Sequence, residues 1–205
     1  MTSTTVHLAV YDTFADWEPG FATAHLTQHG YTVRTVGLTT APVTTMGGVR
    51  IQPDLALDGL DPGDSTLLVL TGASLWDTGD TLAPFARAAR TFLDAGVPVA
   101  AICGATAGLA REGLLDDRPH TSAVSFYLAA TGYAGGAHYV EADAVTGSGS
   151  GGASHGALVT AGPTEPVAFA REIFGLLGVF EPKKLDAWYR LFHDSDASAY
   201  EVLQG

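Results

Sequence analysis

The chain has 205 residues, of which 46% are hydrophobic and 16% are charged, with 25 glycines. This composition excludes a disordered chain and indicates one globular domain over residues 1–205. The formal net charge of −12 disfavours binding to nucleic acid or to an anionic membrane, because like charges repel. One cysteine cannot form an internal disulfide, and the N-terminus lacks a secretory signal pattern, so we expect a cytoplasmic protein.

Apolar runs and amphipathic stretches alternate along the chain. Strands are predicted at residues 5–11, 31–38, 65–72, 97–103, 138–146 and 156–162, with a short extended piece within 47–57. Helices are predicted at residues 16–29, 81–96, 104–113, 121–132, 165–178 and 182–194. The Gly/Ser-rich residues 147–155 indicate a surface loop. The alternation predicts an α/β fold with a mainly parallel sheet and helices on both faces.

The only cysteine, Cys103, stands where the fourth predicted strand gives way to a helix. A lone cysteine is often inert packing. Here, however, Ala101, Gly104 and Ala105 are small, as the sharp turn of a nucleophile elbow requires. Free N–H groups at a helix start stabilise a thiolate, so we expect a thiol pKa below the ordinary value of about 8.5. The pattern favours a reactive thiol over a packed one.

Three carboxylates follow the first predicted strand: Asp12, Asp16 and Glu18. Asp16 has the position of a helix cap. Glu18 lies beside Trp17 and before Pro19, so a carboxyl group facing the site would have apolar surroundings. Burial there would raise its pKa, so that the protonated carboxyl could donate a hydrogen bond to a neighbouring thiolate and serve as a general acid. Spacing alone does not choose among the three acids.

Four segments together resemble the PfpI/ThiJ superfamily, which includes the parkinsonism-linked protein deglycase. They are VYDTFADWEPG, LLVLTGASLWD, VAAICGATAGLAREGLLDDRPHTS and LVTAGPTEPVAFAREIF. The resemblance implies the class I glutamine-amidotransferase-like fold, a flavodoxin-like sandwich with a cysteine nucleophile elbow. It is greatest to a bacterial branch with an ICGA elbow, whose members are mostly called proteases or amidases.

By this resemblance, Cys103 matches the family nucleophile and Glu18 matches the acid that hydrogen-bonds it. The backbone N–H groups of Gly72, Ala73 and Gly104 correspond to the oxyanion site. Ala73 replaces a glycine, so its Cβ would narrow the pocket. The resemblance implies a homodimer and requires no cofactor.

The departures from the family pattern bear on the reaction. Gly104 stands where the protease branch has His, which disfavours a Cys-His protease. FHDSD at 192–196 closes a predicted helix, which does not favour a glutaminase. Isonitrile hydratases carry Asp where Glu18 stands.

Among the seven histidines, His120 is the best candidate for the active site, although a surface or capping role suits it equally. No histidine spacing indicates a metal site. The candidate pocket walls are Asp16, Trp17, Trp76 and Phe126.

Two classes of function are compatible with these residues. In the first, the chain is a cysteine-dependent enzyme in which Cys103 and Glu18 act on a small electrophilic carbonyl, amide or related substrate. Glyoxalase-, amidase- and hydratase-like reactions all fit this class. In the second, the chain is a redox-sensing or chaperone-like stress protein with an oxidisable Cys103.

Overall fold

A computed structural model describes residues 4–149 and 155–205 of the chain. In these ranges the main sheet has the strand order β5-β2-β1-β6-β7-β9-β8. All neighbouring strands of this sheet are parallel except β8, which runs antiparallel to β9. A separate antiparallel ribbon is formed by β3 and β4. The strands are β1 (Thr5–Ala9), β2 (Thr32–Gly37), β3 (Val43–Thr44), β4 (Arg50–Ile51), β5 (Leu55–Ala56), β6 (Leu67–Leu70), β7 (Val99–Ile102), β8 (Ala144–Gly147) and β9 (Leu158–Ala161).

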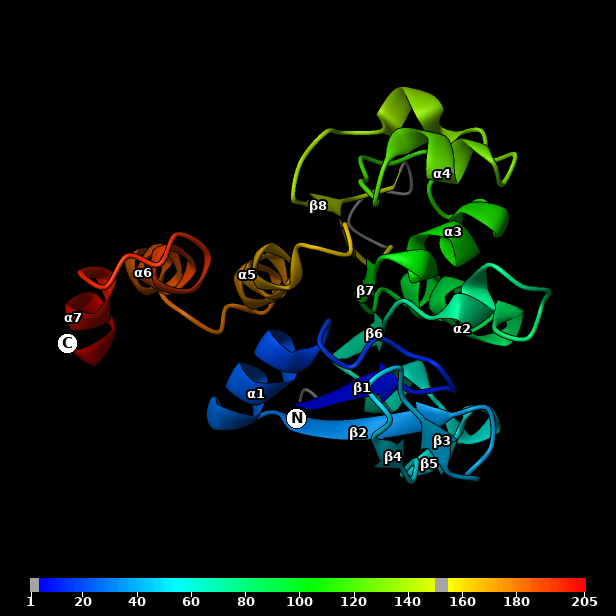
Figure 1. Cartoon of the computed structure of the whole chain (residues 1–205), viewed down its shortest axis with the longest axis horizontal. Helices are drawn as coiled ribbons and strands as arrows, with labels where there is room; N and C mark the ends of the chain where they lie inside the picture. Colours follow the sequence, from blue (N-terminus) through cyan, green and yellow to red (C-terminus); the bar gives the residue numbers. More distant parts are fainter. Residues whose placement is uncertain (1–3, 150–154) are drawn as a thin grey trace.

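Helices cover both faces of the sheet, which confirms the predicted α/β fold (Figure 1). The helices are α1 (Gly20–Gln28), α2 (Ala83–Asp94), α3 (Gly104–Arg111), α4 (Ser125–Ala129), α5 (Pro166–Leu177), α6 (Pro182–His193) and α7 (Ala199–Gln204). Helices α1 and α5 pack together on one face, and α2 and α3 lie on the other. Helices α6 and α7 form an outer layer beyond α5. No helix in the described ranges is long and apolar enough to cross a membrane.

The central strands are buried along their whole length because helices cover them on both sides. Every residue of β6, β7 and β9 is buried, which explains the near-continuous apolar runs in their sequences. The outer layer is anchored by Trp188 of α6, which is buried and packs its ring edge-to-face on Phe174 of α5. The Trp188 indole N–H also donates to His25 Nε2 of α1 at 3.2 Å.

Several predicted boundaries differ from the observed ones. The helix predicted from residue 16 begins at Gly20, because Phe14, Ala15 and Glu18 are buried in the preceding loop instead. The strand predicted at 138–146 is reduced to β8, preceded by a 3₁₀ turn at Gly135–His138. Gly147 belongs to β8 rather than to a loop, and residues 150–154 of the predicted loop lie outside the described residues.

The register of the parallel strands brings three turns to one edge of the sheet. Leu8 of β1 pairs with Val69 of β6, and Leu70 of β6 pairs with Ala101 of β7. The segments that follow β1, β6 and β7 therefore emerge side by side at the carboxyl ends of the strands, where α/β sheets place their sites.

Helix α3 packs closely against the turn after β6 because Gly108 of α3 leaves room for the Trp76 ring of that turn. Trp76 lies in a short 3₁₀ helix, Ser74–Trp76, and its indole N–H donates to the Thr71 carbonyl at 2.9 Å. A Cβ at Gly108 would overlap the Trp76 ring.

We therefore predict that Gly108→Ala lowers the free energy of unfolding by about 1–3 kcal/mol, because the added methyl overpacks the contact with Trp76. The matched control is Gly175→Ala in α5, whose new Cβ would meet Leu185 at an ordinary 3.5 Å. That change should stabilise by about 0.5–1 kcal/mol, since Ala favours a helix interior over Gly. Urea unfolding of both variants checks this, and equal effects of the two changes would contradict the packing argument.

Candidate active site

Cys103 occupies a sharp turn between β7 and α3. Its backbone has φ +58° and ψ −129°, a conformation that residues other than glycine rarely adopt. The turn is held by the Cys103 N–H, which donates to the Ala161 carbonyl of β9 at 3.0 Å. The Cys103 carbonyl accepts from the Thr106 hydroxyl at 2.6 Å. Such a strained, fixed backbone is typical of a functional position, and here it projects a half-buried thiol at the start of a helix.

Glu18 has no exposed surface, although it lies in a loop and carries an ionisable group. Its Oε2 accepts a hydrogen bond from the Gly72 N–H at 2.7 Å. Its Oε1 is buried and has no hydrogen-bond partner among the described residues. A Cβ at Gly72 would lie 2.8 Å from the Cys103 sulfur and 3.0 Å from that oxygen. The sulfur and the carboxyl therefore flank the same small space, which only a glycine at position 72 leaves open.

The loop between β1 and α1 is folded so that Glu18 points inward. Phe14 forms an antiparallel bridge with Ala73, and the Ala15 N–H donates to the Gly72 carbonyl at 2.8 Å. Glu18 thus precedes α1, rather than lying just inside a helix as predicted. Its carboxyl is positioned by the turn after β6.

Burial raises the pKa of the Glu18 carboxyl to about 7, and the hydrogen bond from the Gly72 N–H together with the nearby Cys103 thiol opposes part of that rise. The direction agrees with the sequence-based reasoning. A raised pKa means that the folded protein binds this proton more tightly than the unfolded chain. The resulting stability is present at low pH and is lost as the pH rises through 4.5 toward 7.

The prediction of a thiol pKa below the ordinary value is wrong for this structure. Burial and the negative charge of an ionised Glu18 raise the pKa of Cys103 to about 12. The Gly104 N–H at the helix start does lower it, as expected, but this effect is outweighed. Consequently the pair does not carry two negative charges near neutral pH: a thiolate at Cys103 requires a proton on Glu18.

The three backbone N–H groups predicted to stabilise an oxyanion, those of Gly72, Ala73 and Gly104, do not all have the same role in the structure. The Gly72 N–H is already engaged by Glu18 Oε2 at 2.7 Å, so in this structure Gly72 holds the acid instead of offering a free donor. The Gly104 N–H faces the sulfur and stabilises its charged form. Ala73 and Gly104 remain predictions as oxyanion donors.

The two other carboxylates of the first turn do not join the pair. Asp16 accepts a hydrogen bond from the Thr45 hydroxyl at 2.6 Å. Asp12 accepts from the Thr44 N–H at 2.8 Å. Both acids thus tie the β3–β4 ribbon to the loop after β1. The alternatives that spacing left open are resolved by burial, since only Glu18 reaches the space beside the sulfur.

The candidate pocket aromatics lie in three different settings. Trp76 is buried and lines a cavity of about 390 Å³ together with Gly108. Trp17 is half exposed and lines a hollow of about 320 Å³ with Phe21 of α1 and Phe192 of α6. Phe126 is 76% exposed. The cavity that contains Trp76 and the hollow that contains Trp17 are separate, so these aromatics do not form one pocket wall.

His120 is fully buried, and both of its ring nitrogens have partners outside the pair. Nδ1 lies 2.9 Å from the Arg118 carbonyl, and Nε2 lies 3.1 Å from the Tyr133 hydroxyl. The segment returns to the elbow helix through Ser122, whose hydroxyl lies 2.7 Å from that of Thr106. The geometry gives His120 a packing role in this loop.

Sequence reasoning missed a second polar pair beside the sulfur. The Tyr127 hydroxyl donates to Asp77 Oδ1 at 2.7 Å. The Asp77 charge contributes to the raised pKa of Cys103. Burial and Asp77 raise the pKa of Tyr127. Asp77 follows Trp76 and Tyr127 follows Phe126, which were both candidate pocket residues. Their sequence neighbours could therefore have been considered as site residues.

A family comparison agrees with this geometry. Residues 4–175 match the model of the DJ-1/PfpI family. The chain belongs to the DJ-1/PfpI family. The resemblance inferred from the sequence motifs is thereby confirmed.

Relatives of this DJ-1/PfpI chain cover nearly all of its length. It is 36% identical to "Uncharacterized protease YoaZ" of Bacillus subtilis, over 93% of this chain and 91% of the relative. It is 30% identical to "Uncharacterized protease YdeA" of the same organism, over 86% and 85% of the two chains. A thiJ/pfpI family protein from Bacillus anthracis has a similar crystal structure, with 34% identity, a TM-score of 0.89 and coverage of 100% and 97%. The expectation against proteolysis finds no support in these names.

Mutation can show whether His120 acts together with Cys103 and Glu18 in this DJ-1/PfpI protein. We predict that His120→Asn lowers the free energy of unfolding by about 1–3 kcal/mol, because buried hydrogen-bond partners lose their contacts. The rate at which iodoacetamide alkylates Cys103 should stay within twofold of wild type. Tyr133→Phe, which removes only the hydroxyl beside Nε2, is the matched control and should destabilise less. A His120 variant that unfolds like wild type but alkylates tenfold more slowly would return His120 to the active site.

Proposed function

We propose that the protein is a cysteine-dependent hydrolase in which Cys103 is the nucleophile and Glu18 carries the proton. The observation that supports this most strongly is the fully buried Glu18 carboxyl, which is held by the Gly72 N–H beside the Cys103 sulfur. A carboxyl with a pKa of about 7 can both donate and accept a proton near neutral pH.

The reaction begins when the ionised Glu18 carboxylate takes the proton of the Cys103 thiol, which leaves the negative charge on sulfur. The thiolate attacks the electrophilic carbon, forming the S–C bond, and the carbonyl electron pair moves to oxygen. The backbone N–H groups of Ala73 and Gly104 stabilise that oxygen. Collapse of the intermediate breaks the bond to the leaving group, which takes the Glu18 proton. Water then hydrolyses the thioester, giving its proton to Glu18 and releasing a carboxylic acid while the thiolate is restored.

The substrate class is an amide or a related electrophilic carbonyl. Cys103 is half buried and Glu18 has no exposed surface, so a substrate would meet the sulfur first with the acid behind it. The relatives named as proteases favour a peptide amide within this class. Small amides, nitriles and 2-oxoaldehydes are the other compounds to be tested as substrates. The homodimer stays a prediction.

The alternative is a redox or chaperone-like role that uses oxidation of Cys103. Oxidation selects exposed cysteines with thiolate character. Burial and the ionised Glu18 raise the pKa of Cys103, which disfavours the thiolate in both roles, but only the hydrolase uses Glu18 to take the thiol proton and pass it to a leaving group. We therefore favour the hydrolase.

Two substitutions of one residue test the hydrolase. Glu18→Gln keeps an acceptor for the Gly72 N–H and places an amide donor toward the sulfur, whereas Glu18→Leu supplies neither. We predict that Cys103 of Glu18→Gln alkylates at a lower pH than Cys103 of Glu18→Leu. Both variants should lose at least 100-fold in turnover of the best substrate, because neither side chain carries a transferable proton.

The matched control is Asp16→Asn, which changes an acid two residues away that contacts only the ribbon. It should leave both readouts within twofold of wild type. Cys103→Ser sets the background rate. If Glu18→Leu alkylates and turns over like wild type, Glu18 is a structural residue and the proposal fails.

A further inference from the structure

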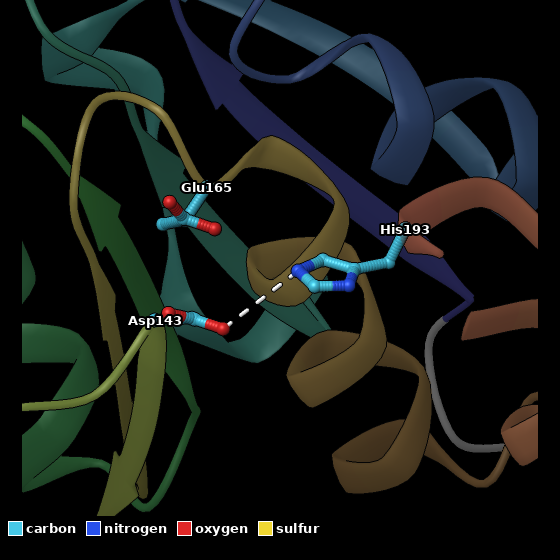
Figure 2. Close-up of side chains that lie close together, drawn as sticks. All are labelled: Asp143, Glu165 and His193. Atoms are coloured by element: carbon cyan, nitrogen blue, oxygen red, sulfur yellow. Dashed lines mark ion pairs between the residues drawn. The ribbon is translucent and has the colours of Figure 1, made fainter. Parts of the chain in front are cut away.

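Three side chains from separate parts of the sequence converge where helix α6 meets the edge of the sheet. Asp143 directly precedes β8, Glu165 directly precedes α5, and His193 is the last residue of α6. Each offers one ligand atom, and these atoms all lie within 4.8 Å of one another. Figure 2 shows the two carboxyl groups and the imidazole directed toward a common space.

The imidazole is oriented as a metal-binding histidine is. Its Nδ1 lies 2.6 Å from Asp194 Oδ1, so that carboxylate fixes the ring and leaves Nε2 facing Asp143. A carboxylate behind a histidine is the usual outer support of a metal-bound imidazole. The ring is further fixed by Tyr189, which stacks on it at 4.5 Å, and Arg171 covers Tyr189.

The distance between Nε2 and its neighbour leaves room for an ion. His193 Nε2 lies 3.7 Å from Asp143 Oδ2, which is too long for a hydrogen bond. Ligand atoms about 2.0–2.2 Å from a tetrahedral Zn²⁺ lie about 3.4 Å from one another. The side chains of Asp143 and His193 are 57% and 34% exposed, so small rotations suffice to close the remaining gap.

The space beside the cluster can hold further ligands. Asp143 and Glu165 line a cavity of about 400 Å³ that also contains Glu141 and Thr121. Water in such a cavity can complete the coordination of an ion. The two converging carboxylates and the net charge of −12 also favour a cation there.

We propose that Asp143, Glu165 and His193 bind a divalent transition-metal ion of the Zn²⁺ type, which clamps the end of α6 to the sheet edge. One imidazole nitrogen with two carboxylates suits Zn²⁺, Co²⁺ or Mn²⁺ better than Ca²⁺ or Mg²⁺, which prefer oxygen alone. The sequence pattern did not indicate this site because its three members are far apart along the chain. The clamp does not depend on the reaction of Cys103.

The test is a Zn²⁺ titration by calorimetry of the full chain carrying Cys103→Ser, which removes the thiol as a competing ligand. We expect one saturable site. Co²⁺ should bind to the same site and give the visible absorption of a nitrogen- and oxygen-coordinated ion. Asp143→Asn and His193→Gln should each weaken Zn²⁺ binding at least tenfold. Glu165→Gln should do the same, which keeps the test valid if one of the other variants does not fold.

The matched control is His155→Gln. His155 Nε2 also lies near one carboxylate, that of Asp94 at 3.8 Å, but it belongs to no such cluster among residues 4–149 and 155–205. Zn²⁺ binding should be unchanged in this variant. The proposal is overturned if no saturable binding occurs, if binding survives the three cluster substitutions, or if Ca²⁺ or Mg²⁺ competes with Zn²⁺ at equal concentration.

Discussion

A carboxyl group with no exposed surface lies beside the only thiol of the chain, and the surrounding structure is arranged around that contact. Glu18 would be costly to bury as an anion, since one hydrogen bond from Gly72 satisfies only one of its oxygens. The protein resolves this by holding the carboxyl near its neutral form, with a pKa of about 7. A carboxyl group with this pKa can accept the proton of the neighbouring thiol and return it near neutral pH.

The fold supplies the two conditions that this contact needs. Parallel pairing of β1, β6 and β7 brings the turns that carry Glu18, Gly72 and Cys103 to one edge of the sheet. Small residues then allow the close approach: a side chain at Gly72 would collide with both the sulfur and the carboxyl. The Trp76 ring fills the space over Gly108 and so positions α3, the helix that begins directly after Cys103.

The elements that sequence predicted well are those whose pattern reflects burial. The apolar runs of β6, β7 and β9 are long enough to be recognised, and Cys103 was placed at the elbow from its small neighbours. The two-residue strand β3 was missed because it has no periodicity to recognise, and α7 was also missed. Strands β4 and β5 both lie within the short extended piece predicted at 47–57.

The errors at the site arose from tertiary contacts. Glu18 is turned inward by pairing between Phe14 and Ala73, which spacing along the chain does not reveal. The thiol pKa was misjudged because a helix start was weighed without the burial and the charge of Glu18. His120 was a reasonable candidate by residue type, but it is enclosed by Arg118 and Tyr133.

The central claim is that burial keeps Glu18 protonated up to neutral pH, and infrared difference spectroscopy tests it most directly. The carbonyl stretch of a protonated carboxylic acid, taken as wild type minus Glu18→Gln, isolates this one group. The account predicts that the band persists at mildly acidic pH and disappears with a midpoint near pH 7. A band that is lost with a midpoint near the ordinary glutamate value of about 4.3 would contradict the account. Glu18 would then be an ordinary ionised carboxylate with no proton to give to the reaction.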